Sequence, residues 1–294
     1  MNKHNHHWEL TPYDLQLIDL AFIEDLGLPY QDLTTSTLFA EAQTTQRIAK
    51  IISKENKPII VSGLRLVQPL LHKIDSTCHF TSRFQDGDQL AFGEILLNLS
   101  GAASSLLQIE RTLLNFLQRL CAIATLTNQY VEKIKHTKTK ILDTRKTIPG
   151  LRRLEKYAVL CGGGVNHRMG LYDAIMIKDT HVDFIGGMKK AVAKLPDDIL
   201  KTCPVIVEVR DLNELDIVLQ EASQKVSRVL LDNMSSDLLI KSVARCQNKM
   251  MTEASGNINL NNIVEIAECG VDFISIGKIT HSAGNVDLSM QCDN

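Results

Sequence analysis

Six short apolar segments, each followed by a polar turn and the pattern of an amphipathic helix, dominate the second half of the chain. They are 140–142, 174–177, 205–209, 229–231, 250–252 and 273–276. Strands that alternate with helices are joined by right-handed crossovers into a parallel sheet, and strands that are apolar throughout are covered on both faces. Charged residues follow strand after strand with no single switch point. We therefore expect a closed α/β barrel of about six strands rather than an open sheet.

The first third of the chain has the mixed pattern of an α+β domain. Helical spacing covers 12–26 and 64–74, and strand-like segments lie at 46–53, 58–61, 79–84 and 95–99. A long helical pattern over 104–135 connects this region to the next. The sequence predicts three parts, which are an N-terminal α+β domain over 1–115, an α/β barrel catalytic domain over 116–280, and a C-terminal segment over 281–294 that returns to the N-terminal domain.

Composition narrows the class of protein. The chain has 294 residues, of which 44% are hydrophobic, and a formal net charge of −2, so it can bury a large core and has no polybasic arm for nucleic acid. No apolar run approaches the roughly 20 residues of a membrane helix. The seven cysteines include no C-x-x-C pair, which is typical of reduced thiols. We expect a cytoplasmic protein without nucleic-acid or membrane partners.

Polar and charged residues follow each predicted strand. They are Asp143 to Lys146, Lys178 to His181, Glu208, Asp232 with Asn233, Glu253 to Gly256, and Gly277 with Lys278 and His281. A single charged residue after a strand is more often a solvated loop residue or half of a local ion pair. Six such positions in succession favour an active site, because active sites of α/β barrels lie at the C-terminal ends of the strands.

The basic residues of this rim come early in the barrel. Arg145, Lys146, Arg168 and Lys178 are basic, and His167 precedes Arg168. Arginine forks match planar carboxylates and phosphates. This part of the rim should therefore bind a substrate with several negative charges.

The later strands supply acids and a glycine-bearing turn. Glu208 and Asp232 end two neighbouring strands and suit Mg²⁺, which takes one or two carboxylates together with substrate phosphates; alternatively, they neutralise the neighbouring bases. Ser255-Gly256-Asn257 and Gly277 close the last two units, where barrels often bind phosphate through backbone N–H groups. The expected ligand is a sugar phosphate.

Several longer motifs resemble one known family over nearly the whole chain. They are Glu110-Arg111, the ten residues from Asp143 to Arg152, the seven from Gly162 to Arg168, Glu253 to Gly256, and Thr280 to Ser282. In this order they are similar to nicotinate-nucleotide pyrophosphorylase (carboxylating), also called quinolinate phosphoribosyltransferase. The resemblance implies an N-terminal α+β domain, a C-terminal α/β barrel with fewer than eight strands, and a homodimer with shared active sites.

The resemblance also implies roles for individual residues. The implied catalytic residues are Lys146, Lys178, Glu208 and Asp232, of which Glu208 and Asp232 face Mg²⁺ and the ribose. Those implied to bind quinolinate and phosphoribosyl pyrophosphate are Arg111 from across the dimer interface, Thr144, Arg145, His167, Arg168 and His281. Those implied to hold the 5-phosphate are Ser255, Gly256, Asn257 and Gly277.

The implied reaction makes nicotinate mononucleotide, pyrophosphate and CO₂ for NAD biosynthesis. The chain departs from the family pattern at Cys121, Thr180, Arg210, which flanks Glu208, and Asn257, the last of which replaces a second glycine. Asparagine tolerates positive φ better than other residues with a side chain, so phosphate contacts can survive this change. A transferase acting on another base, or a non-catalytic metabolite-binding barrel, are the alternatives.

Overall fold

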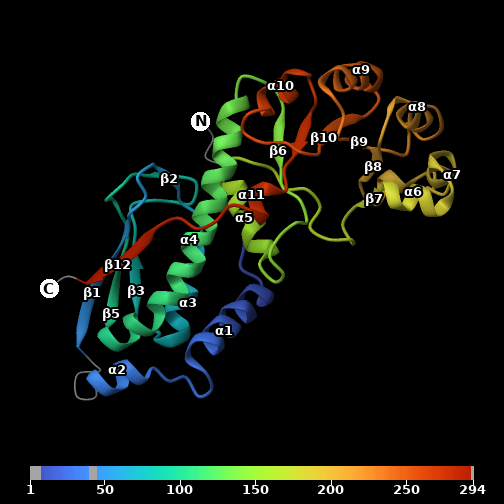
Figure 1. Cartoon of the computed structure of the whole chain (residues 1–294). Coiled ribbons are helices and arrows are strands. Elements are labelled where there is room, and N and C mark those ends of the chain that lie inside the picture. Colours follow the sequence, from blue (N-terminus) through green and yellow to red (C-terminus); the bar gives the residue numbers. More distant parts are fainter. Residues whose placement is uncertain (1–7, 40–44, 293–294) are drawn as a thin grey trace. The chain divides into compact units, whose positions relative to one another are not determined.

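A computed structural model describes residues 8–39 and 45–292, which form two compact units (Figure 1). The first unit contains the described parts of 1–126 and 282–294 together with 148–163. The second, called the barrel unit below, contains Thr127–Thr147 and Gly164–His281. Within the described residues, no helix is both long enough and apolar enough to cross a membrane.

The first unit is built on an antiparallel sheet with the strand order β12-β1-β5-β3. Its strands are β1 (Gln46–Ser53), β3 (His79–Thr81), β5 (Ile95–Ala102) and β12 (Leu288–Cys292), and a separate pair joins β2 (Ile59–Ile60) to β4 (Gln89–Leu90). The helices are α1 (Pro12–Leu26), α2 (Leu33–Leu38), α3 (Leu64–Ile74), α5 (Arg152–Cys161) and the first part of α4 (Ala103–Ile134). The predicted α+β region is therefore confirmed, and β12 pairs with β1.

Helix α5 groups with the first unit, although its residues lie inside the range 116–280 that the sequence assigns to the barrel. The buried carboxylate of Glu155 accepts hydrogen bonds from Nε and Nη2 of Arg119 at 3.0 and 2.7 Å. The Tyr157 hydroxyl donates to Asp86 at 2.6 Å. Contacts with residues far away in the sequence, such as Arg119 and Asp86, decide the unit to which helix α5 belongs. The helical periodicity of a sequence does not reveal these contacts.

Cys121, one of the departures from the family pattern, is a buried structural residue of this unit. Its Sγ accepts a hydrogen bond from the Ser62 backbone N–H at 3.3 Å. Burial raises the pKa of the Cys121 thiol to about 12. A thiol held protonated is a poor nucleophile, which agrees with a structural role for Cys121.

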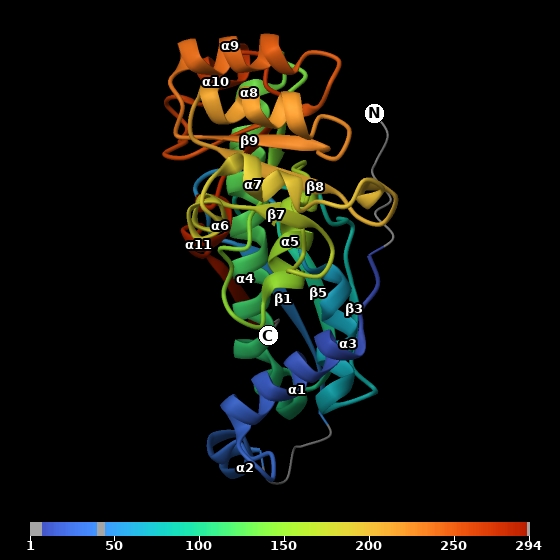
Figure 2. The same cartoon turned by 90° about the vertical axis from the view of Figure 1, so that its right-hand side faces the viewer.

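The barrel unit contains six parallel strands in the order β6-β11-β10-β9-β8-β7. The strands are β6 (Lys140–Leu142), β7 (Ile175–Ile177), β8 (Val205–Val209), β9 (Arg228–Asp232), β10 (Met251–Ser255) and β11 (Phe273–Ser275). The helices are α6 (Asp179–Ile185), α7 (Met188–Ala193), α8 (Leu212–Glu221), α9 (Ser236–Cys246), α10 (Ile263–Glu268) and α11 (Lys278–His281). Helices α7, α8 and α9 lie on the outer side of the strands (Figure 2). The predicted incomplete α/β barrel is confirmed.

Two details of the barrel differ from the expectation. Among the six described strands, β6 and β7 are the edges, so the hydrogen-bonded ring is open rather than closed. Leu142 instead forms a single parallel bridge with Val165, because the chain between β6 and β7 runs along that edge first. Strand β10 extends to Ser255 instead of ending at 252, which places Glu253 inside the strand.

Candidate active site

A cavity of about 810 Å³ opens at the C-terminal ends of the barrel strands. All its lining residues belong to the barrel unit. It is lined by the predicted residues Thr144, Arg145, Lys146, His167, Arg168, Lys178, Glu208, Asp232, Ser255, Gly256, Asn257, Gly277 and His281. Arg111 is exposed on α4, in the first unit, and does not line the cavity. Most of these side chains follow the ends of the six parallel strands, while His167 and Arg168 come from the segment between α5 and β7.

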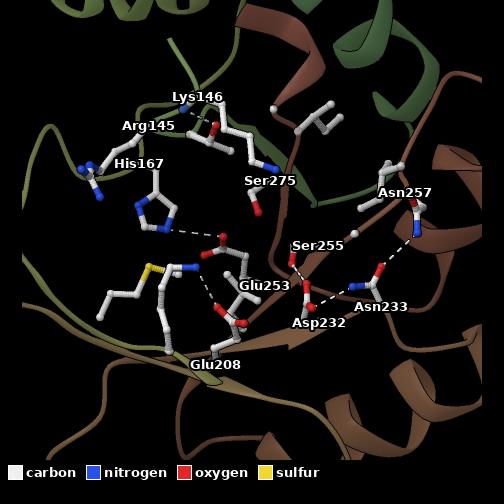
Figure 3. Close-up of a pocket in the computed structure, with 18 of the residues that line it drawn as sticks. Arg145, Lys146, His167, Glu208, Asp232, Asn233, Glu253, Ser255, Asn257 and Ser275 are labelled. Atoms are coloured by element: carbon white, nitrogen blue, oxygen red, sulfur yellow. Dashed lines mark hydrogen bonds and ion pairs between the residues drawn. The ribbon is translucent and has the colours of Figure 1, made fainter. Parts of the chain in front are cut away.

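Basic residues occupy one side of the cavity (Figure 3). Arg145 and Lys146 follow β6, and the Lys146 backbone is held by hydrogen bonds from its N–H to Thr144 Oγ1 at 3.0 Å and from Thr280 Oγ1 to its carbonyl at 2.7 Å. Burial, together with the positive charge of Arg145, lowers the pKa of Arg168. Like charges held this close favour binding of an anion between them.

Glycine at position 277 makes room for the lysine. A Cβ at Gly277 would lie 2.8 Å from Cδ of Lys146, closer than carbon atoms approach. The missing side chain therefore lets Lys146 lie against the β11–α11 turn with its ammonium group toward the cavity, as Figure 3 shows.

Two carboxylates, Glu208 on β8 and Asp232 at the end of β9, line the cavity beside Lys178. Oε2 of Glu208 lies 3.1 Å from Nζ of Lys178. Burial raises the pKa of Glu208, Lys178 opposes this shift, and the charges of Asp232 and Asp179 add to it. The Asp232 carboxylate accepts hydrogen bonds from Ser255 Oγ and from Asn233 Nδ2, both at 2.7 Å. These bonds fix the Asp232 carboxylate, whose negative charge contributes to the raised pKa of Glu208.

The turn after β10 has the backbone of an anion-binding loop. Gly256 and Asn257 adopt positive φ values of 95° and 52°. A Cβ on Gly256 would lie 2.1 Å from Oδ1 of Asn233, so this position requires glycine. Asn257 donates from Nδ2 to the same oxygen at 3.1 Å. Asparagine thus replaces the family's second glycine while keeping the left-handed backbone, and successive backbone N–H groups in such turns form concave anion sites.

Two of the sequence departures lie away from the chemistry. Thr180 is exposed and does not line the cavity. Arg210, which flanks Glu208 after β8, points to Asp183 and Glu214 at 2.9 and 2.5 Å. Neither residue therefore alters the cavity wall.

Sequence reasoning did not assign a role to Asn233 or Glu253, although both line the cavity. Asn233 holds Asp232 and Asn257 in place through the bonds described above. Its position directly after a strand-ending acid is a signal that could have identified it. Glu253 is entirely buried within β10. Burying a charged side chain inside an apolar strand costs free energy unless the charge has a partner. A glutamate at an interior position of a strand could therefore have indicated that Glu253 has a specific role.

The fold and this site define a class of protein, an α/β barrel enzyme that binds a polyanionic, phosphate-bearing ligand at the C-terminal ends of its strands. Two family descriptions match the chain: the N-terminal domain of quinolinate phosphoribosyl transferase over residues 32–121 and its C-terminal domain over residues 123–291. The chain belongs to the quinolinate phosphoribosyltransferase family.

Individual relatives are similar to the chain over nearly its full length. The decarboxylating quinolinate phosphoribosyltransferase 1b of Nicotiana tabacum is 37% identical, covering 96% of this chain and 83% of the relative. The probable carboxylating nicotinate-nucleotide pyrophosphorylase of Bacillus subtilis is 37% identical, covering 94% and 92%. The structure of nicotinate-nucleotide pyrophosphorylase from Francisella tularensis superposes with a TM-score of 0.85 at 38% identity, covering 97% and 98%.

Proposed function

We propose that this protein transfers the phosphoribosyl group of phosphoribosyl pyrophosphate to quinolinate and makes nicotinate mononucleotide, pyrophosphate and CO₂ for de novo NAD synthesis. The observation that carries the proposal is the pairing, within one cavity, of the mutually repelling arginines Arg145 and Arg168 with the carboxylates Glu208 and Asp232. A base with two carboxylates and a sugar carrying phosphates and a metal ion satisfy both sets of charges.

The reaction needs charge stabilisation more than proton transfer. The pyridine nitrogen of quinolinate attacks the anomeric carbon, and the bond from that carbon to the pyrophosphate oxygen breaks with its electron pair leaving on oxygen. The ring nitrogen becomes cationic. The bond to the carboxylate beside it then breaks, CO₂ leaves, and the electron pair left on the ring carbon takes up a proton. The cavity's contribution is positioning and preorganised charge.

The residues of the cavity divide this work. Arg145 and Arg168 would hold the carboxylates of quinolinate, and Lys146 and Lys178 would stabilise the negative charge on departing pyrophosphate. Thr144 and His281 would complete the walls around the substrates. The 5-phosphate would bind the backbone of the turn at Ser255, Gly256 and Asn257, together with Gly277, while Glu208 and Asp232 would face the cationic sugar.

The same two carboxylates fit Mg²⁺. Among the described residues, no group of three or more His, Cys, Asp or Glu side chains is arranged to hold a metal ion. Mg²⁺ commonly binds one or two carboxylates plus substrate phosphates. The raised pKa of Glu208, to which Asp232 contributes, is a repulsion that a cation would relieve. Bound with the substrate, Mg²⁺ would neutralise charge on the pyrophosphate leaving group.

A homodimer with shared active sites is part of the proposal. Arg111 matches a substrate-binding arginine of the family, yet it does not line the cavity of its own barrel unit. We expect it to reach the cavity of a second copy. Mixing Arg111→Ala chains with Lys146→Ala chains should restore part of the activity, since one of the two sites in a mixed dimer is then intact. No recovery after demonstrated subunit exchange would contradict sharing.

The decisive experiment supplies the protein with Mg²⁺, quinolinate and phosphoribosyl pyrophosphate and measures nicotinate mononucleotide by chromatography and CO₂ from carboxyl-labelled quinolinate. Formation of both in equal amounts supports the proposal. Tight binding of quinolinate without turnover would instead favour a metabolite-binding protein. We expect a cytoplasmic location, to be tested by cell fractionation, although plant relatives are named as chloroplastic and mitochondrial.

A further inference from the structure

The buried carboxylate of Glu253 is the feature of the cavity that the proposed chemistry leaves unexplained. Its side chain is entirely buried, and its oxygens make ion-pair contacts rather than well-formed hydrogen bonds. The two oxygens face one nitrogen each, Nε2 of His167 at 3.4 Å and Nε of Arg228 at 3.1 Å.

The two nitrogens of His167 have different partners. Nδ1 accepts a hydrogen bond from the backbone N–H of Arg168 at 2.7 Å, and a nitrogen that accepts a hydrogen carries no proton of its own. Nε2 faces the Glu253 carboxylate, where a lone pair would be repelled and an N–H is favoured (Figure 3). The two contacts together place the single ring proton on Nε2 and leave the imidazole neutral.

This arrangement directs His167 toward the protein rather than the ligand. Its side chain is only 7% exposed, and both ring nitrogens already have protein partners. What His167 holds is the main chain of Arg168, whose guanidinium donates from Nη1 to the Ala174 carbonyl at 3.2 Å and lines the cavity. The Arg168 backbone is thus fixed on one side by the ring and on the other by its own anchored side chain.

We propose that Glu253 is a positioning residue, which holds His167 as a neutral, Nε2-protonated ring and through it fixes Arg168 for binding quinolinate. The inference rests on the proposed function for the identity of the ligand. It changes the expected role of His167, which supports the arginine instead of donating to a substrate carboxylate itself. The carboxylates of quinolinate are then held by guanidinium groups.

A purely structural role for Glu253 is the competing explanation, because it also neutralises Arg228, which lies over the Phe273 ring at 4.8 Å. The variants Glu253→Gln and Glu253→Leu separate the two roles. Both remove the charged partner of Arg228, so both should lower the melting temperature to a similar extent. Glutamine keeps an oxygen that can accept from Nε2–H of His167, whereas leucine does not.

The leucine variant should raise KM for quinolinate by about tenfold or more, since it leaves a buried N–H without an acceptor, while KM for phosphoribosyl pyrophosphate changes less than about threefold. The glutamine variant should raise KM for quinolinate several times less. Equal effects of both variants, or an unchanged KM for quinolinate in a folded leucine variant, would overturn the proposal.

A second measurement does not depend on these variants folding or on turnover. The ring nitrogens of ¹⁵N-histidine-labelled wild-type protein can be observed by NMR, with His167 assigned from the signal that disappears in His167→Gln. We expect one protonated and one unprotonated nitrogen in the Nε2–H form at neutral pH. A doubly protonated ring, or a proton on Nδ1, would overturn the positioning role whatever the protein's substrate is.

Discussion

Like charges lie together on both sides of the cavity, Arg145 with Arg168 on the basic side and Glu208 with Asp232 on the acidic side, where Lys178 also pairs with Glu208. On the basic side, burial and Arg145 lower the pKa of Arg168. On the acidic side, burial and the neighbouring acids raise the pKa of Glu208, against the effect of Lys178. On each side, binding of an oppositely charged ligand would reduce the electrostatic repulsion between the like-charged side chains. This arrangement supports the proposed binding of an anionic substrate on one side of the cavity and of Mg²⁺ on the other.

The largest expected effect comes from breaking the basic side. Arg168→Ala should lower kcat/KM for quinolinate by about 100-fold, since charged hydrogen bonds contribute about 1.5–3 kcal/mol each and 1.4 kcal/mol is a factor of ten. Steady-state kinetics with quinolinate varied measure it. Arg245→Ala, which removes an exposed arginine paired with Asp216 on the outer helices, is the matched control and should stay within about twofold. Equal losses in both variants would contradict the assignment.

Removing a carboxylate from the acidic side should weaken Mg²⁺ binding and leave quinolinate binding nearly unchanged. Glu208→Gln should raise the Mg²⁺ concentration for half-maximal activity by about tenfold, because a neutral amide is a weaker ligand than a carboxylate. Quinolinate binding, measured by calorimetry, should change less than about twofold, which separates the two sides. The matched control is Asp216→Asn on helix α8. An unaltered Mg²⁺ requirement in Glu208→Gln would remove this residue from the metal site.

The pH dependence sharpens the same comparison. Glu208 has a folded-state pKa raised above its ordinary value of 4.5, so it takes up a proton at higher pH than an exposed glutamate and then loses its affinity for a cation. The Mg²⁺ requirement should therefore rise as pH falls toward that pKa. Lys178→Met removes the charge that lowers this pKa and should therefore shift the rise in Mg²⁺ requirement to higher pH. A Mg²⁺ requirement that is the same at every pH would contradict this account.

The smallest expected effect lies in the phosphate turn. Asn257→Gly should change KM for phosphoribosyl pyrophosphate by less than about threefold, because the gain from relieving a φ of 52° offsets the loss of the bond to Asn233. The opposite substitution, Gly256→Ala, should raise KM for phosphoribosyl pyrophosphate much more, since a Cβ there would lie 2.1 Å from Oδ1 of Asn233. A larger loss in Asn257→Gly than in Gly256→Ala would mean that the Asn257 side chain itself binds the phosphate.

Much of the fold could be predicted from sequence because it depends on local periodicity. The bounds of α1, α3, β1, β6 and β8 coincide with the predicted segments. What periodicity could not give are long-range pairings. Strand β12 pairs with β1, which lies far away in the sequence, as Met290 does with Ile51, and α5 joins the first unit through contacts such as Glu155 with Arg119.

The site residues that lie at or directly after the end of a strand could be predicted from the sequence. Parallel topology alone brings Lys146, Glu208 and Asp232 to one cavity, so their positions in the sequence sufficed. Glu253 was harder to predict, because its partners His167 and Arg228 come from other parts of the barrel unit. Its strand appeared to end at 252, which made an interior carboxylate look like a rim residue.

The measurement that tests the central claim most directly is the ratio of kcat/KM for quinolinate to that for nicotinate, at saturating Mg²⁺ and phosphoribosyl pyrophosphate. Nicotinate has one carboxylate, so it would leave one of the charged donors on the basic side without a partner. The account predicts a preference for quinolinate of at least about tenfold, since an unpaired buried donor costs about 1–3 kcal/mol or more. Comparable values for the two bases would contradict the assignment of Arg145 and Arg168 to the two carboxylates.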